Sequence, residues 1–356
     1  MKNKFSITPV LLLAIFLSIA GNAQNKVASN SDKKVNVQLS CVAFYNLENL
    51  FDTINNDNVN DEEYTPEGPN KWNYYKYNAK LQHMSYAISQ IGLDYSPVGV
   101  AILGVSEIEN RGVLEDLVKQ PDLAKRSYEI VHYDSPDRRG VDVGLIYNPK
   151  LFIVTNSKSY RLKMEDPEFL TRDQLMVSGY LQGEKVHVIV NHWPSRYGGD
   201  VASSSKREAA AALTRSISDS LFRVDPKAKI IIMGDLNDDP TDKSCAVVLG
   251  AKKEAKDVKD GELFNTLWNT LENGVGSLAY NDQWNLFDQI IVSAELTHGD
   301  RSKLKLWKAE VFNRSFLTQQ EGKYKGTPWR THSGGAWTNG YSDHYPTLIY
   351  LVKEVK

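Results

Sequence analysis

The sequence predicts a single α/β domain in which β-sheets are covered by helices. Seven apolar runs of strand length recur along the chain, and amphipathic helical patterns lie between some of them. No repeat or low-complexity linker divides the pattern. The chain has 356 residues, 41% of them hydrophobic, which is enough for one large domain or two small ones. The undivided pattern favours one large domain.

The first 23 residues have the layout of a secretory signal peptide. Two lysines precede an apolar stretch from Val10 to Ala20, and small residues follow at Gly21 and Ala23, where a signal peptidase would cleave. The apolar stretch is too short for a permanent membrane anchor, and no later segment approaches membrane-spanning length. We therefore expect cleavage near Ala23 and a periplasmic or secreted protein without stable membrane insertion.

Residues 24–38 are polar and lack periodicity, so we expect a flexible leader, followed by the folded domain at residues 39–356. The chain has 42 basic and 44 acidic side chains, and loss of Lys2 and Lys4 with the signal leaves 40 against 44, a net charge of −4. That charge excludes binding of long nucleic acids by general electrostatic attraction alone. A phosphate-bearing substrate would need a local site.

The apolar runs have the length and composition of buried strands. Two helices are predicted from apolar residues three or four apart, one over 81–91 that ends at Gly92 and one over 210–221 that ends before Pro226. The predicted strands cover residues 41–46, 98–107, 141–148, 185–193, 229–235, 287–293 and 345–352.

Two segments look like insertions into this framework. Residues 55–77 are acidic and aromatic, and residues 316–340 are rich in glycine and aromatics. Only two cysteines are present, Cys41 and Cys245, which excludes a disulfide scaffold and a zinc–thiolate site. Both lie beside apolar residues, so we expect buried free thiols, although an exported protein could pair them.

Polar residues of similar chemistry recur where the predicted strands end. Oxygen donors gathered without cysteine indicate a hard divalent cation, Mg²⁺ first and Mn²⁺ or Ca²⁺ next. Histidines beside carboxylates indicate acid–base chemistry, and Asn and Arg side chains can donate to phosphate oxygens. Each residue alone has an ordinary structural explanation, such as a turn or a satisfied buried histidine. Their recurrence favours one active site, with the candidates Asn46, Glu48, Glu107, His192, Asp235, Asn237, Asp288, Asp343 and His344.

Six segments resemble the motif series of the endonuclease/exonuclease/phosphatase superfamily: NLEN, GVSEIEN, NHWPSR, GDLND, FDQIIVS and SDHYP, in this order and spacing. That superfamily includes pancreatic-type deoxyribonucleases, abasic-site endonucleases, sphingomyelinases and inositol-polyphosphate phosphatases. The resemblance extends from about Ser40 to Val352, and the segment RGVDVGLIYNP is most similar to bacterial secreted nucleases. It implies a four-layer sandwich of two packed mixed β-sheets flanked by helices.

The resemblance also implies how the metal and the phosphate are bound. Glu107 is expected to be the main metal ligand, with Glu48 and Asp343 at or near the metal. The phosphate is expected to be bound by Asn46, Arg172 and Asn237.

The same resemblance implies the acid–base groups. Asp235 is expected to orient or deprotonate the attacking water, and Asp288 to pair with His344. His192 stands where deoxyribonuclease-type members have a second catalytic histidine. Asn237 belongs to the catalytic set as well as to the phosphate-binding one.

We therefore expect a monomeric, divalent-metal-dependent phosphodiesterase, an endonuclease that hydrolyses DNA or RNA by in-line attack of water. An alternative keeps the chemistry and changes the substrate, as in a phosphatase or phospholipase-C-like enzyme acting on lipid head groups or inositol phosphates. The acidic balance slightly favours that alternative. A binding protein without activity is less consistent with the sequence, because Glu107, Asp235 and His344 are all present.

Overall fold

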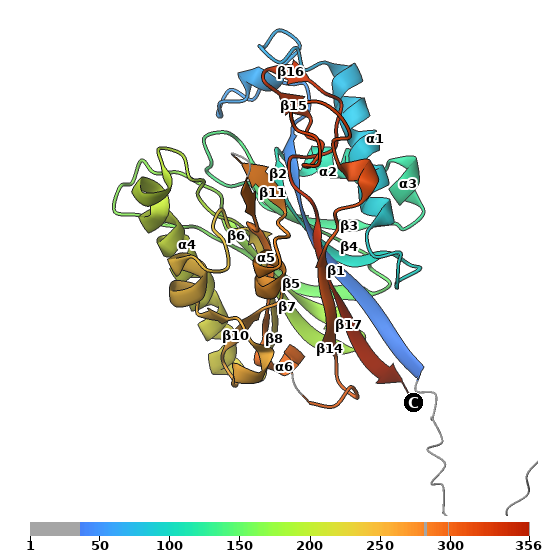
Figure 1. The fold of residues 1–356 in the computed structure, drawn as a ribbon, viewed down its shortest axis with the longest axis vertical. Helices are drawn as coiled ribbons and strands as arrows, with labels where there is room; N and C mark the ends of the chain where they lie inside the picture. Colours follow the sequence, from blue (N-terminus) through green and yellow to red (C-terminus); the bar gives the residue numbers. More distant parts are fainter. Residues whose placement is uncertain (1–35, 281–282, 298, 356) are drawn as a thin grey trace, which may run out of the picture. The chain divides into compact units, whose positions relative to one another are not determined.

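Two mixed β-sheets pack face to face, and helices cover their outer faces, as Figure 1 shows with α4 on one side and α1 and α2 on the other. This is the four-layer sandwich that the resemblance to the superfamily implied. The computed structural model describes residues 36–280, 283–297 and 299–355. The expected signal peptide at 1–23 and the leader up to residue 35 lie outside them. Within these described residues, no helix is both long and apolar enough to cross a membrane.

The first sheet has the strand order β14-β17-β1-β2-β4-β3, in which only β1 and β2 run parallel. Its first strand begins at Asn36, which pairs with Val355. Residues 36–38, assigned to the leader by sequence, therefore belong to the sheet; they are exposed and carry no apolar signal. The strands are β1 (Asn36–Leu50), β2 (Val100–Ile108), β3 (Glu129–His132), β4 (Asp142–Tyr147), β14 (Lys305–Val311) and β17 (Thr347–Val355).

The second sheet has the order β5-β6-β7-β8-β13-β10-β9, with β7 and β8 parallel at its centre. Two short hairpins, β11–β12 and β15–β16, lie outside both sheets. The strands of the second sheet are β5 (Phe152–Tyr160), β6 (Gln174–Leu181), β7 (Glu184–His192), β8 (Lys229–Asp235), β9 (Ala251–Lys252), β10 (Leu263–Asn265) and β13 (Asp288–Ser293); the hairpins are β11 (Leu278–Tyr280) with β12 (Gln283–Asn285) and β15 (His332–Ser333) with β16 (Ala336–Trp337).

The two predicted helices are present and longer than their apolar stripes. The first is α1, whose N-terminus is capped by Asn73 accepting from the Lys76 amide at 3.1 Å. The second is α4, which ends before Pro226. The helical segments are α1 (Tyr74–Gln90), α2 (Arg111–Val118), α3 (Pro121–Ala124), α4 (Asp200–Val224), α5 (Trp268–Glu272), α6 (Ala294–Thr297) and the short turns η1 (Glu62–Tyr64), η2 (Ser244–Leu249), η3 (Ala255–Asp257) and η4 (Ser315–Leu317).

The core has three layers of contacts, one between the sheets and one under each set of helices. Between the sheets, Gly104 permits close approach, because a Cβ there would lie 2.5 Å from the Met233 sulfur. Cys41 lies under α1 and Cys245 lies under α4, in different layers. Both are buried free thiols, as expected from their apolar neighbours.

The buried residue His187 in the second sheet leads to a prediction of how the free energy of unfolding depends on pH. His187 shares a hydrogen bond of 2.7 Å with the Ser178 hydroxyl, and burial, followed by Lys185, lowers the His187 pKa to about 4. Because unfolding restores an ordinary pKa, the unfolded chain binds a proton between about pH 6.5 and 4 that the folded protein does not. We expect the free energy of unfolding to decrease over this range as the pH falls.

Urea unfolding of the wild type and His187→Gln at pH 7 and pH 4.5 measures this effect. The decrease should be smaller in His187→Gln, because that variant has no imidazole to protonate. An equal decrease in both proteins would assign the acid sensitivity to other groups.

Candidate active site

The candidate residues meet at one edge of the sandwich, where β1 and β2 of the first sheet and β7 and β8 of the second end. His192 and Asp235 are paired across β7 and β8, and Asp288 is opposite Asp235 where β13 begins. A hydrogen bond crosses between the sheets, with the Asn46 amide donating to Asp235 Oδ2 at 3.0 Å. Both side chains are buried. The expected gathering of these residues is therefore present.

Several residues at this edge have left-handed backbone conformations, which set the direction of their side chains. Glu48, Asn49, Glu107 and Asn237 have φ values of 46°, 52°, 56° and 51°. Such values are uncommon for residues other than glycine and concentrate at functional sites. The pairing of β1 with β2 is also irregular between Asn46 and Leu50. These departures from regular strand geometry turn polar side chains away from the alternating in-and-out pattern.

Asp235 lies at the centre of the site. Its Oδ1 accepts from the Asn237 amide at 3.0 Å, and its Oδ2 lies 3.7 Å from His192 Nε2 and 3.9 Å from His344 Nε2. Burial raises the Asp235 pKa to about 7, even though His344 acts in the opposite direction. A carboxylate with such a pKa can accept a proton near neutrality.

His344 is held as a cation. Its Nδ1 lies 2.6 Å from Asp288 Oδ2, which also accepts from the Ser277 hydroxyl at 2.5 Å. Burial disfavours the imidazolium, but Asp288 and then Asp343 outweigh it and hold the His344 pKa well above its usual value. Since Nδ1 is bonded to Asp288, the Nε2 proton remains available to a substrate.

The pKa of His192 is shifted in the opposite direction. Burial first, then the positive charges of Arg172 and Arg139, hold the His192 pKa well below its usual value. Its Nε2 lies 3.9 Å from Glu107 Oε1, while its Nδ1 is buried without a hydrogen-bond partner among the described residues. One neutral and one protonated imidazole therefore flank Asp235, an arrangement that suits acid–base chemistry.

Glu107 and Asp343 are the most accessible carboxylates of the group. Their side chains are 14% and 32% exposed, and Glu107 Oε2 accepts from the Asn49 amide at 3.0 Å. Carboxylate oxygens open to solvent fit a hard divalent cation that retains water ligands, as Mg²⁺ does. These residues therefore fit the metal that the sequence predicted. The side chains of Asp235, Asp288 and His344 also lie close enough together to hold a metal ion, but the hydrogen bond between His344 and Asp288 engages two of the three.

Glu48 faces a loop rather than the open edge. Its oxygens accept from the backbone amides of Thr331 at 2.6 Å and His332 at 3.4 Å. Lys80 lies beside it and donates to Thr331 Oγ1 at 2.6 Å and to the Tyr341 carbonyl. Burial, and then Asp343, raises the Glu48 pKa to about 7; burial lowers the Lys80 pKa to about 8. The metal role of Glu48 stays a prediction, and its observed contacts anchor the loop.

The two insertions form one wall beside the site. Aromatic contacts join them, and the β15–β16 hairpin lies against the start of α1 at the top of Figure 1. Residues 74–77, taken from sequence as part of an insertion, are the first turn of α1. The ring contacts, with centroid distances, are Phe51–Tyr64 (4.3 Å), Tyr64–Trp72 (5.9 Å), Trp72–His332 (5.7 Å) and Tyr75–Trp337 (5.6 Å).

Arg172 lies beneath the site and not at its surface. Its side chain is 7% exposed, and its guanidinium donates to Asp137 at 3.2 Å and to the Trp193 carbonyl at 2.6 Å. Asn237 Nδ2 donates to the same carbonyl at 2.9 Å. The phosphate-binding roles of Arg172 and Asn237 stay predictions, and for Arg172 two donor groups are already engaged.

Sequence reasoning missed two residues of the site. Arg139 has an exposed guanidinium 3.9 Å from Glu107, and its position at the start of the RGVDVGLIYNP segment was an available signal. Ser277 donates to Asp288, and nothing in its neighbourhood of the sequence indicates this.

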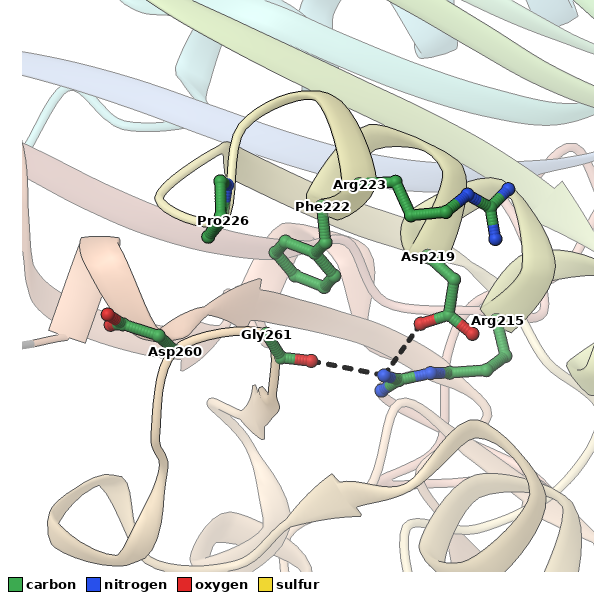
Figure 2. A pocket seen from close by; sticks show the side chains of 7 residues that line it. All are labelled: Arg215, Asp219, Phe222, Arg223, Pro226, Asp260 and Gly261. Atoms are coloured by element: carbon green, nitrogen blue, oxygen red, sulfur yellow. Dashed lines mark hydrogen bonds and ion pairs between the residues drawn. The ribbon is translucent and has the colours of Figure 1, made fainter.

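A surface pocket of about 430 Å³ lies elsewhere, between α4 and the Asp260–Gly261 turn (Figure 2). Arg215 there pairs with Asp219 at 2.7 Å and donates to the Gly261 carbonyl at 3.1 Å. Its charge is thus satisfied within the fold, and none of the candidate residues lines this pocket.

Residues 41–353 match the model of the endonuclease/exonuclease/phosphatase family. The chain belongs to this family. Members of the endonuclease/exonuclease/phosphatase family hydrolyse phosphoesters, which agrees with the residues gathered at the sheet edge. No curated protein sequence matches the chain.

Solved structures of the family share the fold. A humanised TDP2 from D. rerio has 12% sequence identity and a TM-score of 0.52, covering 88% of this chain and 98% of its own. A family protein from Bacteroides thetaiotaomicron has 16% identity and a TM-score of 0.52, covering 90% and 100%. The mannosyl-6-phosphatase Bt3783 from Bacteroides thetaiotaomicron VPI-5482 has 16% identity and a TM-score of 0.51, covering 88% and 99%. At these identities the likeness establishes the fold.

The buried Lys80 ammonium predicts a stability effect. Its Nζ donates to Thr331 Oγ1 and to the Tyr341 carbonyl, and its charge favours the ionised form of Glu48. Replacing Lys80 with Met removes these interactions, which should lower the free energy of unfolding by roughly 1–3 kcal/mol. Adding Glu48→Gln should recover part of the loss. Urea unfolding with chelator present measures both variants, with Lys119→Met, at a side chain 70% exposed, as the control. A Lys80→Met protein as stable as that control would contradict this role of Lys80.

Proposed function

We propose that this protein is an exported, divalent-metal-dependent phosphodiesterase that hydrolyses nucleic acid. The observation that carries the proposal is the position of the Asp235 carboxylate, 3.7 Å from His192 Nε2 and 3.9 Å from His344 Nε2, with His344 hydrogen-bonded to Asp288. Attack of water on a phosphate ester needs a proton acceptor for the water and positive charge for the phosphate oxygens. Asp235 and His344 offer these two groups side by side.

The proton acceptor is held in place from two directions. The Asn46 side-chain amide donates to Asp235 Oδ2, and the backbone amide of Asn237 donates to Asp235 Oδ1. These bonds fix the orientation of the carboxylate while leaving lone pairs for a water molecule. Asp235 thus orients the attacking water and receives its proton.

His344 stabilises the negative charge that develops on the phosphate. Asp288 fixes its tautomer and keeps the imidazole charged, and the Nε2 proton is the donor. His192, being neutral, contributes a hydrogen bond rather than a charge. A divalent cation held by Glu107 and Asp343 would polarise the phosphate and stabilise the leaving oxygen.

Nucleic acid is the proposed substrate because a similar structure, TDP2 from D. rerio, contains a single-strand DNA product. Export is proposed from the signal-like residues 1–23. The mannosyl-6-phosphatase structure is about as similar to this chain, so a phosphomonoester is the second candidate. The two candidates share the same hydrolytic step and differ in what surrounds the phosphate.

A substrate panel tests the proposal. Purified protein with Mg²⁺ or Mn²⁺ should cleave single-stranded DNA, plasmid DNA or RNA faster than mannose 6-phosphate, phosphatidylinositol phosphates or sphingomyelin. Excess chelator should abolish turnover, because the phosphate then lacks the cation that polarises it. Glu107→Gln should shift the metal requirement to higher concentration. Full turnover in chelator would exclude the mechanism, and exclusive cleavage of a monoester would select the second candidate.

The His344–Asp288 pair should behave as one unit. His344→Ala and Asp288→Asn should each lower kcat by roughly 10²–10⁴-fold, and the double variant should lose little more than either alone. Tm must be measured with turnover, since both side chains are buried. Normal turnover in a folded His344→Ala would remove this residue from the mechanism.

A further inference from the structure

We propose that Arg139 binds the phosphate group of the substrate beside Glu107, and that Arg172 and Asp137 position it from beneath. This assignment rests on the proposed function and adds a substrate-binding residue to it. The Arg139 side chain is 49% exposed, lies 3.9 Å from Glu107 Oε2 and donates to Asn49 Oδ1. It therefore places a guanidinium at the accessible side of the site.

The turn that carries Arg139 is fixed by buried contacts. Asp137 Oδ1 accepts from the Arg139 backbone amide at 3.0 Å, and Asp137 Oδ2 pairs with Arg172 at 3.2 Å. Arg172 donates in turn to the Trp193 carbonyl, which also accepts from Asn237. A continuous set of hydrogen bonds thus ties the Arg139 turn to the residue next to the Asp235 carboxylate.

Three other lysine and arginine side chains near the site are already engaged within the fold. Lys80 is buried and donates to Thr331, and Arg172 is buried against Asp137. Arg196 donates to the Asn237 carbonyl and to acidic side chains. Arg139 combines an accessible guanidinium with a position next to Glu107.

A guanidinium suits a phosphate because its planar fork can donate two parallel hydrogen bonds to two phosphate oxygens. The hydrogen bond to Asn49 uses one of its donors and leaves others for the substrate. The neighbouring Arg138 instead pairs with Glu168 at 3.2 Å, and both of these side chains are exposed. The chain therefore offers a matched control in the adjacent position.

The test compares Arg139→Ala, Arg139→Lys and Arg138→Ala. With the substrate that wild type cleaves best, Arg139→Ala should lower kcat/KM by roughly 10–100-fold, the loss typical of a hydrogen bond to a charged group. Arg139→Lys should recover part of the loss, because the charge returns without the fork. Arg138→Ala should stay within about twofold of wild type. A folded Arg139→Ala that matches Arg138→Ala overturns the proposal.

Phosphate binding tests the same residue without turnover. In calorimetric titrations with Mn²⁺ present, inorganic phosphate should bind Arg139→Ala more weakly than wild type, while Mn²⁺ itself should bind no more weakly. Equal loss of both ligands would mean that Arg139 acts only on Glu107, which contradicts the assignment. This measurement also separates the two proposals. If the wild type cleaves no phosphoester, the proposed function fails, and the phosphate titration still decides the role of Arg139.

The positioning role of Arg172 and Asp137 has its own signature. Asp137→Asn should lower kcat/KM and weaken phosphate binding in the same direction as Arg139→Ala. Combined with Arg139→Ala it should add no further loss of phosphate affinity, because it acts through that side chain. Additive losses in a folded double variant would show that Arg172 and Asp137 act on the substrate independently.

Discussion

The hydrogen bond from Asn46 to Asp235 joins the two sheets at the edge where the site forms. Asn46 belongs to the first sheet and Asp235 to the second, and both are buried. The bond can form only when the sheets are packed at their native separation. Small residues help to set that separation, since a side chain at Gly104 would contact Met233 of the opposite sheet. The geometry of the candidate site is thus a property of the sandwich interface and not of either sheet alone.

Burial at that interface also sets the charges. Removal from water favours the neutral form of Asp235 and of His192. His344 experiences the same desolvation but has Asp288 in direct contact, so it remains a cation. The difference between the two histidines therefore comes from their charged neighbours, which are acidic beside His344 and basic near His192. Similar side chains in one desolvated site acquire different roles in this way.

The two insertions, residues 55–77 and 316–340, are connected to the site by contacts between distant segments. Glu48 lies on β1 near the site, and its contacts with Thr331 and His332 connect the catalytic edge to the second insertion. The first insertion joins through ring contacts such as that of Trp72 with His332. The Arg139 turn also borders Glu107. The surroundings of the phosphate are therefore built from loops that a common fold supports, which is where substrate preference can vary.

The sequence by itself determined the class of fold, the seven central strands and the two long helices, because buried elements carry apolar runs and stripes of their own period. It did not reveal β5 and β14, which are edge strands with many polar residues and therefore lack such runs. β6 was missed as well, although it is largely buried, because serine and glycine interrupt its apolar residues. Residues 36–38 lacked an apolar signal for the same reason as the edge strands: their side chains are exposed.

For the site, the sequence identified residue types at strand ends, since oxygen donors and histidines are informative wherever they fall. Only the tertiary structure decided which of them are exposed, which are charged and which are already bonded. Arg172 and Arg139 illustrate the difference, because both are arginines in polar segments and only packing buries one and exposes the other. Burial and neighbouring contacts arise from segments distant in the sequence, such as Ser277 donating to Asp288. No local pattern encodes such a contact.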